Sequence, residues 1–228
     1  MLVCISPWPT AQIVEPVADV LDVEAAVDEA RSIAREHSKA ALAWWLAPEH
    51  AGFGPELEAL GLVNEDTPGF EAVENAMALV GPPSGPSVGE VEVKVVETFA
   101  EYLAAAQIGD AAFGIESSPE ADLRRRFDEL QASPHGVCLL ASIDGRAVGG
   151  AFAVLGDAGV NLFGGSVHPE FRGRGVYRAL TAARWRLAVE RGTPALTVQA
   201  GRMSRPICER LGFRFVEPVR LYVDQVPA

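Results

Sequence analysis

The residues with the clearest capacity for chemistry form one short turn, Arg172-Gly173-Arg174-Gly175. The turn follows an apolar run that is typical of a strand and precedes apolar residues at helical spacing. Glycines leave backbone amides unobstructed, and the amides that open a helix lie at the positive end of its dipole. Arginine side chains add charge-assisted hydrogen bonds to phosphate oxygens. The turn therefore predicts a phosphate site, with a solvated surface turn as the alternative for so short a pattern.

Apolar and turn-forming patterns place this turn late in a mixed α/β arrangement. Asp144-Gly145 predicts a tight hairpin, and Gly164-Gly165 inside the next strand predicts a bulge or a close ligand approach. We expect Gly192 and Gly212 each to end a helix. The expected strands span 91–96, 137–143, 147–155, 159–167 and 195–199, with a final pair up to Val223; the expected helices span 98–113, starting near Thr98 or Glu97, 119–131 with Ser118 as N-cap, 175–191, and 204–211.

Glycine, proline and serine make up most of the segment from Gly81 to Gly89, which predicts a linker between two halves. The first half repeats the closing elements in outline, with a helix at 23–37, strands at 41–46 and 76–80, and the run 55–62 between the strands. Residues 55–61 share proline, glutamate, leucine and glycine with residues 206–212 at the same spacing. The pattern favours a degenerate half-repeat, although a match this short also arises by chance. The predicted domains are 1–81 and 90–228, joined by a linker at 82–89.

The composition favours a compact globular protein whose surface repels polyanions. Of 228 residues, 49% are hydrophobic and 22% are charged, and the formal net charge of −12 disfavours nucleic acid and anionic membranes as partners. Six arginines between Arg172 and Arg191 nevertheless permit a local anion site. The acidic surface suits a cationic acceptor or serves solubility alone.

The three cysteines and four histidines are scattered, without the spacing of metal ligands or paired disulfides. We therefore expect no metal, and free thiols in a reducing compartment. The chain lacks the basic start of a signal peptide, and no run approaches the ~18 apolar residues that cross a bilayer. The expected location is the cytoplasm.

The turn and its surroundings resemble the GCN5-related N-acetyltransferase (GNAT) family. The hallmark of that family, (Arg/Gln)-x-x-Gly-x-(Gly/Ala), opens the helix after the fourth strand; Arg172 and Gly175 match it, and Tyr177 stands at its last small position. A Val-x-Pro before the turn and a Leu-Gly-Phe after it also agree, so the resemblance covers residues 91–223. It implies an α/β (α+β) acyl-CoA N-acyltransferase fold, a mixed and mostly antiparallel sheet flanked by helices, here preceded by a partial GNAT-like half.

The resemblance also implies acetyl-coenzyme A as co-substrate. In the family the amides of the turn hold the coenzyme A pyrophosphate, and the pantetheine lies where the fourth and fifth strands separate. An amide of the fourth strand polarises the thioester carbonyl, and an amine attacks it directly without a covalent enzyme intermediate. On this sequence the cofactor-binding residues would be Val167, Arg172, Gly173, Arg174, Gly175, Val176 and Tyr177.

Proton transfer has no clear residue in this sequence. Many relatives carry a tyrosine on the last helix that protonates the departing thiolate, and Cys208 stands there. Because coenzyme A leaves readily as a thiolate, Cys208 also reads as a packing residue, with Tyr222 as a substitute donor. His168 and Glu116 are weak candidates for the general base, and a chain of waters would serve equally well.

These features predict an N-acetyltransferase that acts on a small amine or a peptide amino group. The alternative is a non-catalytic acyl-CoA-binding regulatory protein, because Tyr177 crowds the turn and Cys208 replaces the usual proton donor. A third hypothesis is an interaction scaffold without cofactor, favoured if Tyr177 blocks the site. Trp44 and Trp45 are candidates to line an acceptor cleft shared by the halves, but adjacent residues of a strand face opposite sides, so we expect at least one to pack in the core or between domains.

Overall fold

The computed structural model describes residues 2–4, 10–15, 22–66, 71–114 and 116–225. The chain forms two compact units, Met1–Ala76 with Glu217–Ala228, and Met77–Val216. Strand β4 (Val73–Leu79) begins in the first unit and ends in the second, whereas strand β10 (Arg214–Gln225) begins in the second unit and ends in the first. The boundaries of the two compact units therefore fall within these two strands.

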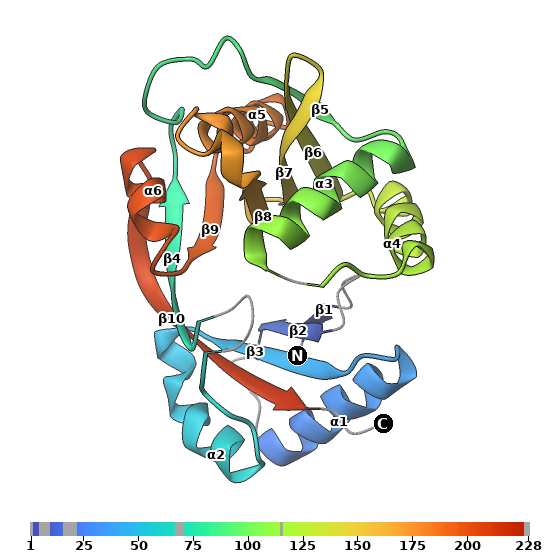
Figure 1. Cartoon of the computed structure of the whole chain (residues 1–228). Helices are drawn as coiled ribbons and strands as arrows, with labels where there is room; N and C mark the ends of the chain where they lie inside the picture. The colour runs from blue at the N-terminus through green and yellow to red at the C-terminus, as the bar shows by residue number, and fades with distance from the viewer. Residues whose placement is uncertain (1, 5–9, 16–21, 67–70, 115, 226–228) are drawn as a thin grey trace. The chain divides into compact units, whose positions relative to one another are not determined.

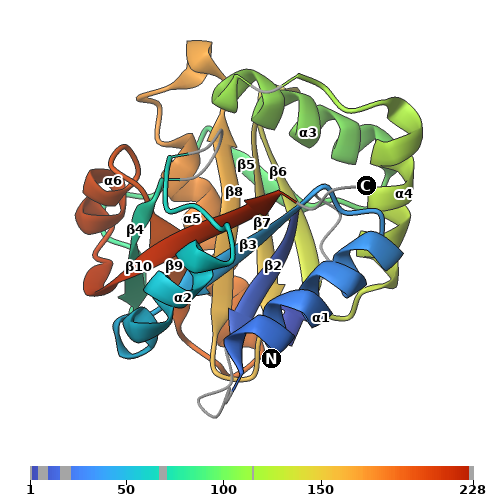
Figure 2. The ribbon, with the colours of Figure 1, turned by 90° about the horizontal axis from the view of Figure 1, so that it is seen from below.

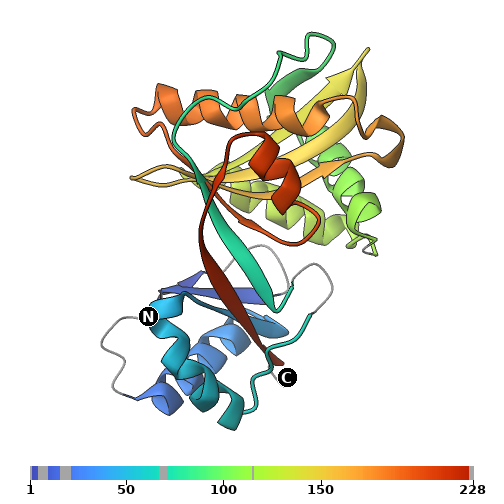
Figure 3. The same ribbon diagram turned by 90° about the vertical axis from the view of Figure 1, so that its left-hand side faces the viewer.

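The second unit contains a mixed sheet in the order β9-β8-β7-β6-β5 (Figure 1). Strands β5 to β8 pair antiparallel in succession, whereas β9 runs parallel to β8. Helix α3 lies on one face of this sheet and α5 on the other (Figure 3). The elements are β5 (Glu92–Val95), α3 (Phe99–Phe113), α4 (Glu120–Ala132), β6 (Gly136–Ile143), β7 (Arg146–Leu155), β8 (Val160–Val167), η2 (Pro169–Phe171), α5 (Val176–Glu190), β9 (Leu196–Ala200) and α6 (Arg205–Arg210). This arrangement is the GNAT fold that the sequence predicts.

Two adjacent glycines on β7 let the helices of both faces approach the sheet. A Cβ at Gly149 would lie 2.7 Å from Val176 of α5 and 3.2 Å from Leu180, while a Cβ at Gly150 would lie 3.1 Å from Ala105 of α3. Neighbouring residues of a strand face opposite sides. The glycines therefore seat one helix on each face, against apolar clusters that fill both layers.

The local turn signals are confirmed. Asp144 and Gly145 have φ of 50° and 76°, and they join β6 to β7 as a hairpin. Gly164 has φ of 57°, and the register of β7 with β8 shifts opposite it, so Gly164-Gly165 forms a bulge. Gly192 and Gly212 also take positive φ directly after helices α5 and α6.

Three predicted boundaries are wrong. Ser118 is not the N-cap of α4, because the helix starts one residue later with Pro119 in the cap position and no side-chain capping bond. The expected final pair of strands is the single strand β10, which contains Pro218 and pairs with β3 (Ala41–Leu46) from Arg220 to Gln225. Strand β4 starts at Val73, ahead of the predicted residue 76.

In the first unit a parallel strand pair is connected by a helix. Strands β2 (Thr10–Glu15) and β3 (Ala41–Leu46) pair parallel, helix α1 (Val23–Glu36) links them, and the end of β10 pairs antiparallel with β3. Helices α1 and α2 (Gly54–Ala59) cover the same face of these strands (Figure 2). Strand β1 (Leu2–Cys4) and the short helix η1 (Pro48–Phe53) complete the unit.

Trp44 and Trp45 are both core residues, as one of the two expectations had it. They are 4% and 5% exposed, and they pack in different clusters, Trp44 beneath α1 and α2 and Trp45 with Val219 and Leu221 of β10. The alternation of side chains along β3 accounts for this division.

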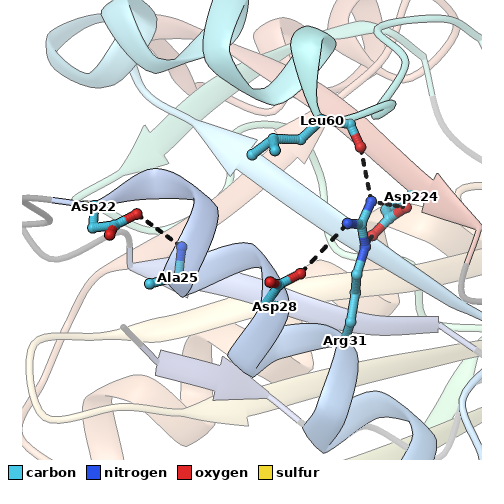
Figure 4. Close-up of polar contacts among 6 residues, drawn as sticks. All are labelled: Asp22, Ala25, Asp28, Arg31, Leu60 and Asp224. Atoms are coloured by element: carbon cyan, nitrogen blue, oxygen red, sulfur yellow. Dashed lines mark hydrogen bonds and ion pairs between the residues drawn. The ribbon is translucent and has the colours of Figure 1, made fainter.

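An ion pair fixes the end of β10 in the first unit (Figure 4). Arg31 of α1 donates from Nε and Nη2 to the two carboxylate oxygens of Asp224, at 2.8 and 3.1 Å, and from Nη2 to the carbonyl of Leu60 at 2.9 Å. The hydrogen bond with Asp224 raises the pKa of Arg31. Asp22 caps the same helix by accepting from the amide of Ala25 at 2.9 Å.

Candidate functional site

The arginine- and glycine-rich turn presents open backbone at the start of a long helix. Gly173 and Gly175 have φ of 81° and 78°, in the left-handed region that favours glycine. Gly175 is the N-cap of α5, and the first amides of a helix have no acceptor within the helix itself. A Cβ at Gly173 would have no atom within 4 Å. The turn thus combines free amides, the positive helix end and open space, which together suit a phosphate group.

The two arginines of the turn differ in their surroundings. Arg172 is exposed. Arg174 donates from Nη2 to the Glu90 carboxylate at 3.0 Å, and its guanidinium lies 5.3 Å from the centre of the Phe171 ring. Both side chains are exposed, but Arg174 is held by Glu90, whereas Arg172 has no ion pair among the described residues.

The predicted linker 82–89 contains no helix or strand, but it packs on the first turn of α5. A Cβ at Gly175 would lie 2.9 Å from Val88, and a Cβ at Gly85 would lie 3.2 Å from Arg178. These contacts place the predicted linker beside the turn.

Strands β8 and β9 separate beside the turn. Their parallel pairing joins residues 160–162 to residues 196–198 and is not continued over the last residues of β8, which contain the Gly164-Gly165 bulge. We call the space between the separating strands, on the α5 side of Gly165, the notch. Such a separation exposes backbone that a regular sheet would pair.

The amide of Val167 is directed toward the notch. The amide of His168 donates to the carbonyl of Val148 on β7, at 2.9 Å. Amides of successive residues in a strand point to opposite edges, so the Val167 amide points away from β7, toward the β9 edge. Among the predicted cofactor-binding residues, Val167 is the one that lies on β8, and its amide faces the place where β8 and β9 separate.

Tyr177 lies in the notch and does not cover the turn. A Cβ at Gly165 would lie 2.7 Å from the Tyr177 ring, so the ring lies directly on this glycine. The hydroxyl interacts with the thiol of Cys208 and with Arg184, and burial raises the pKa of Tyr177 to about 12. The bulky residue at the family's small position therefore fills part of the space where the resemblance places pantetheine.

Cys208 on α6 is fully buried in an apolar cluster with Leu196, Leu211 and Phe213. Burial raises the pKa of its thiol. These surroundings support the packing role, and the structure brings Cys208 together with Tyr177, the two residues that depart from the family pattern.

The remaining catalytic candidates have different surroundings. His168 caps the short helix η2, where its Nδ1 accepts from the amide of Glu170 at 3.4 Å and its ring meets Phe171 edge-on. Glu116 is exposed in the α3–α4 loop. Tyr222 is buried in the core of the first unit, and a Cβ at Gly54 would lie 2.3 Å from its hydroxyl.

Arg184 is a residue of the site that sequence reasoning missed. It is 0% exposed on the sheet-facing side of α5 and interacts with Tyr177. A signal was present, because Arg184 follows Leu180 by four residues and so continues the apolar stripe of the helix. An arginine in such a stripe is unusual enough to mark for inspection.

Within the described ranges, no three histidine, cysteine or acidic side chains gather closely enough to hold a metal ion. Nor does this part of the chain include a helix with the length and apolar character needed to cross a membrane.

Comparison with known proteins supports the fold of the chain and finds a family match within the second unit. The model of the acetyltransferase (GNAT) family matches residues 103–213. A GCN5-related N-acetyltransferase from Kribbella flavida superimposes with a TM-score of 0.66 and 22% identity, over 94% of this chain and 80% of that one. One from Sphaerobacter thermophilus gives 0.65 and 14%, over 99% and 76%. A tandem GNAT protein from the clavulanic acid biosynthesis pathway gives 0.62 and 16%, over 96% and 76%.

No curated protein sequence matches the chain. The family match contains the turn, the notch and Cys208, and the structural relatives share the fold over nearly the whole chain. Residues 103–213 therefore match the acetyltransferase (GNAT) family, and the structural relatives share its fold, which supports an acyltransferase.

Proposed function

We propose that this protein transfers an acetyl group from acetyl-CoA to the amine of a small molecule or a peptide. The observation that carries the proposal is the open turn at Gly173 to Val176, which starts α5 beside the separating strands β8 and β9. A pyrophosphate at this turn would receive the free amides and the helix dipole. The arrangement supports a cofactor that combines a diphosphate with a long arm reaching between the strands.

The residues around the notch would act by binding and orientation. Bound acetyl-CoA supplies an activated acyl carbon, and the chain holds it in place for direct attack by the amine. The Val167 amide would donate to the thioester oxygen, where negative charge develops during attack. Arg172, Gly173, Arg174, Gly175, Val176 and Tyr177 would complete the cofactor contacts, with backbone amides supplying most of them.

Proton transfer would involve a base for the attacking amine and the fate of the departing thiolate. His168 and Glu116 are the candidate general bases for the amine. Water would also accept the proton that the amine loses during attack. Cys208 would have to protonate the coenzyme A thiolate, but burial raises the pKa of its thiol and makes it a weaker acid. Departure of coenzyme A as a thiolate fits this better than protonation by Cys208.

We further propose that residues 1–81 are a degenerate GNAT-like half, joined by 82–89 to the acetyltransferase domain at 90–228. Strands β2 and β3 pair parallel around helix α1, as β8 and β9 pair parallel around α5. Helix α2 and strand β4 then follow in the same order as α6 and β10. The match of a tandem GNAT protein along 96% of this chain supports the same division.

A specific observation favours the second candidate, a regulatory protein that binds acyl-CoA without transfer. The Tyr177 ring lies on Gly165 in the notch, so binding requires this ring to move or the pantetheine to take another course. Calorimetry with acetyl-CoA, followed by assays of thiol release with a panel of amines, separates the candidates. Binding with turnover supports the enzyme, binding without turnover on any amine supports the regulator, and no binding refutes both.

A pair of glycine variants tests the position of the site. Gly173 and Gly192 have φ of 81° and 75°, and at each a Cβ would meet no atom within 4 Å. Both Gly173→Glu and Gly192→Glu therefore introduce the same strain and charge, at opposite ends of α5. We expect Gly173→Glu to weaken acetyl-CoA binding at least about a hundredfold, because its carboxylate faces the pyrophosphate. Gly192→Glu should bind as the wild type does, and equal affinities in the two variants would refute the site.

A further inference from the structure

Arg184 is a buried cation without an anionic partner among the described residues. Its side chain is 0% exposed, and its two hydrogen bonds go to neutral backbone carbonyls, Nε to Leu180 at 3.2 Å and Nη1 to Phe152 at 3.3 Å. Nη2 has no hydrogen-bond acceptor. A buried charge of this kind costs several kcal/mol unless an opposite charge offsets it.

The groups that face Arg184 do not neutralise it. They are the Tyr177 hydroxyl and ring of α5, the Cys208 thiol of α6 and the backbone at Gly165 of β8. Burial raises the pKa of both Tyr177 and Cys208, so neither is an anion near neutral pH. The guanidinium lies 5.9 Å from the centre of the Tyr177 ring, at the outer limit of a cation–π contact.

The unpartnered nitrogen is aimed into the notch. Nη2 lies 3.6 Å from the position of a Cβ on Gly165, next to the Tyr177 ring that lies on the same glycine. Gly165 precedes Val167 by two residues, on the stretch of β8 that β9 does not pair. The turn is a separate anion site, because its own amides serve the pyrophosphate.

We propose that Arg184 binds an anionic group at the acyl or sulfur end of the coenzyme A ligand, after the Tyr177 ring leaves Gly165. This inference rests on the proposed function, since it assumes that coenzyme A enters the notch. Two sources carry such an anion: the free carboxylate of a dicarboxylic acyl group, and the thiolate of unacylated coenzyme A. In either case the ligand supplies the counter-charge that the described residues do not.

Calorimetry with three ligands tests the proposal. Acetyl-CoA is neutral at its acyl end, succinyl-CoA carries a carboxylate there, and coenzyme A gains a thiolate as the pH rises through the thiol's reference pKa of about 8.5. The pyrophosphate is common to all three ligands and cancels from the differences. We expect either succinyl-CoA to bind at least about tenfold more tightly than acetyl-CoA, or coenzyme A to gain at least about tenfold over acetyl-CoA between pH 7 and pH 9.

Arg184→Gln removes the charge, and Arg186→Gln is the matched control, an exposed arginine two residues further along α5. Arg184→Gln should abolish the preference for the anionic ligand, whereas Arg186→Gln should keep the preference and bind acetyl-CoA within about twofold of the wild type. Preference for succinyl-CoA assigns the carboxylate, and a pH-dependent gain for coenzyme A assigns the thiolate.

Thermal unfolding separates the proposed role from a purely structural one, because the two predict opposite changes in the Tm of Arg184→Met. If Arg184 awaits an anion, Arg184→Met should raise the Tm of the free protein, because an apolar side chain replaces an uncompensated charge. A lowered Tm in Arg184→Met would mean that the bonds to Leu180 and Phe152 are its role, and would overturn the proposal. Wild-type binding of acetyl-CoA without any preference for an anionic ligand also overturns it and leaves the proposed function intact. If acetyl-CoA does not bind at all, both fail.

Discussion

Glu74 is a carboxyl group held inside the first unit, on β4, with 8% of its surface exposed. Burial, more than any other cause, raises the pKa of Glu74 to about 7. The folded chain therefore holds a proton that the unfolded chain releases near pH 4.5. Stability from this group is fully present below pH 4.5 and is lost as the pH rises to about 7.

We expect Glu74→Gln to remove that loss. At pH 8 the variant should be more stable than the wild type by on the order of 1–3 kcal/mol, while near pH 4.5 the two should be alike. Urea unfolding at both pH values measures the difference. Glu58→Gln, at an exposed carboxylate of α2, is the control and should follow the wild type at both. A Glu74→Gln variant with the same pH dependence as the wild type would contradict the burial argument.

Residues of the site could be predicted from the sequence only where neighbouring residues alone determine their conformation. Gly164, Gly173 and Gly175 could be predicted, because a bulge or a turn at positive φ selects glycine through the backbone alone. Arg184 and the direction of Tyr177 could not, because each depends on atoms of β8 and α6 that the chain brings near only on folding.

Helix starts illustrate the same point for elements. Thr98 accepts from the amide of Glu101 at 3.4 Å, and the Glu101 carboxylate accepts from the amide of Thr98 at 3.2 Å, a complete capping box. A hydrogen bond from Lys94 lowers the pKa of Glu101 to about 2, so the carboxylate stays charged. The predicted cap at Ser118 fails, because Pro119 takes the cap position of α4.

We expect Thr98→Ala to destabilise the protein by about 1 kcal/mol, the usual effect of losing an N-cap hydroxyl. Ser118→Ala removes the same hydroxyl ahead of the next helix and should change the free energy of unfolding by less than about 0.5 kcal/mol. Urea denaturation of both variants checks this. Equal losses would mean that Ser118 caps α4 in solution, against the structure.

Over the whole molecule, the first unit needs the last residues of the chain. Strand β10 leaves the second unit near Glu217 and pairs with β3 from Arg220 to Gln225, and Arg31 holds Asp224 there. Asp224 is 4% exposed, and its hydrogen bonds with Arg31 offset the burial of its charge.

We expect Arg31→Ala to cost about 3–5 kcal/mol, as removing one partner of a buried pair does. The matched control is Arg35→Ala on the exposed side of the same helix, which should cost less than about 0.5 kcal/mol. Urea unfolding gives both values, and limited proteolysis should release the C-terminal residues faster in Arg31→Ala. A loss as small as that of Arg35→Ala would show that the pair contributes little.

The sequence by itself determined the order of helices and strands from β5 to α6, the hairpin at Asp144-Gly145, the bulge at Gly164-Gly165 and the turn at Gly173 to Gly175. Each follows from hydrophobic period or from backbone torsion, which act over a few residues. Only the tertiary structure decided that β10 contributes residues to both units, that Tyr177 turns into the notch, and that Arg184 lies near Gly165 without a counter-charge among the described residues. Those facts depend on which distant segments pack together, and no spacing along the chain encodes the electrostatic surroundings that packing creates.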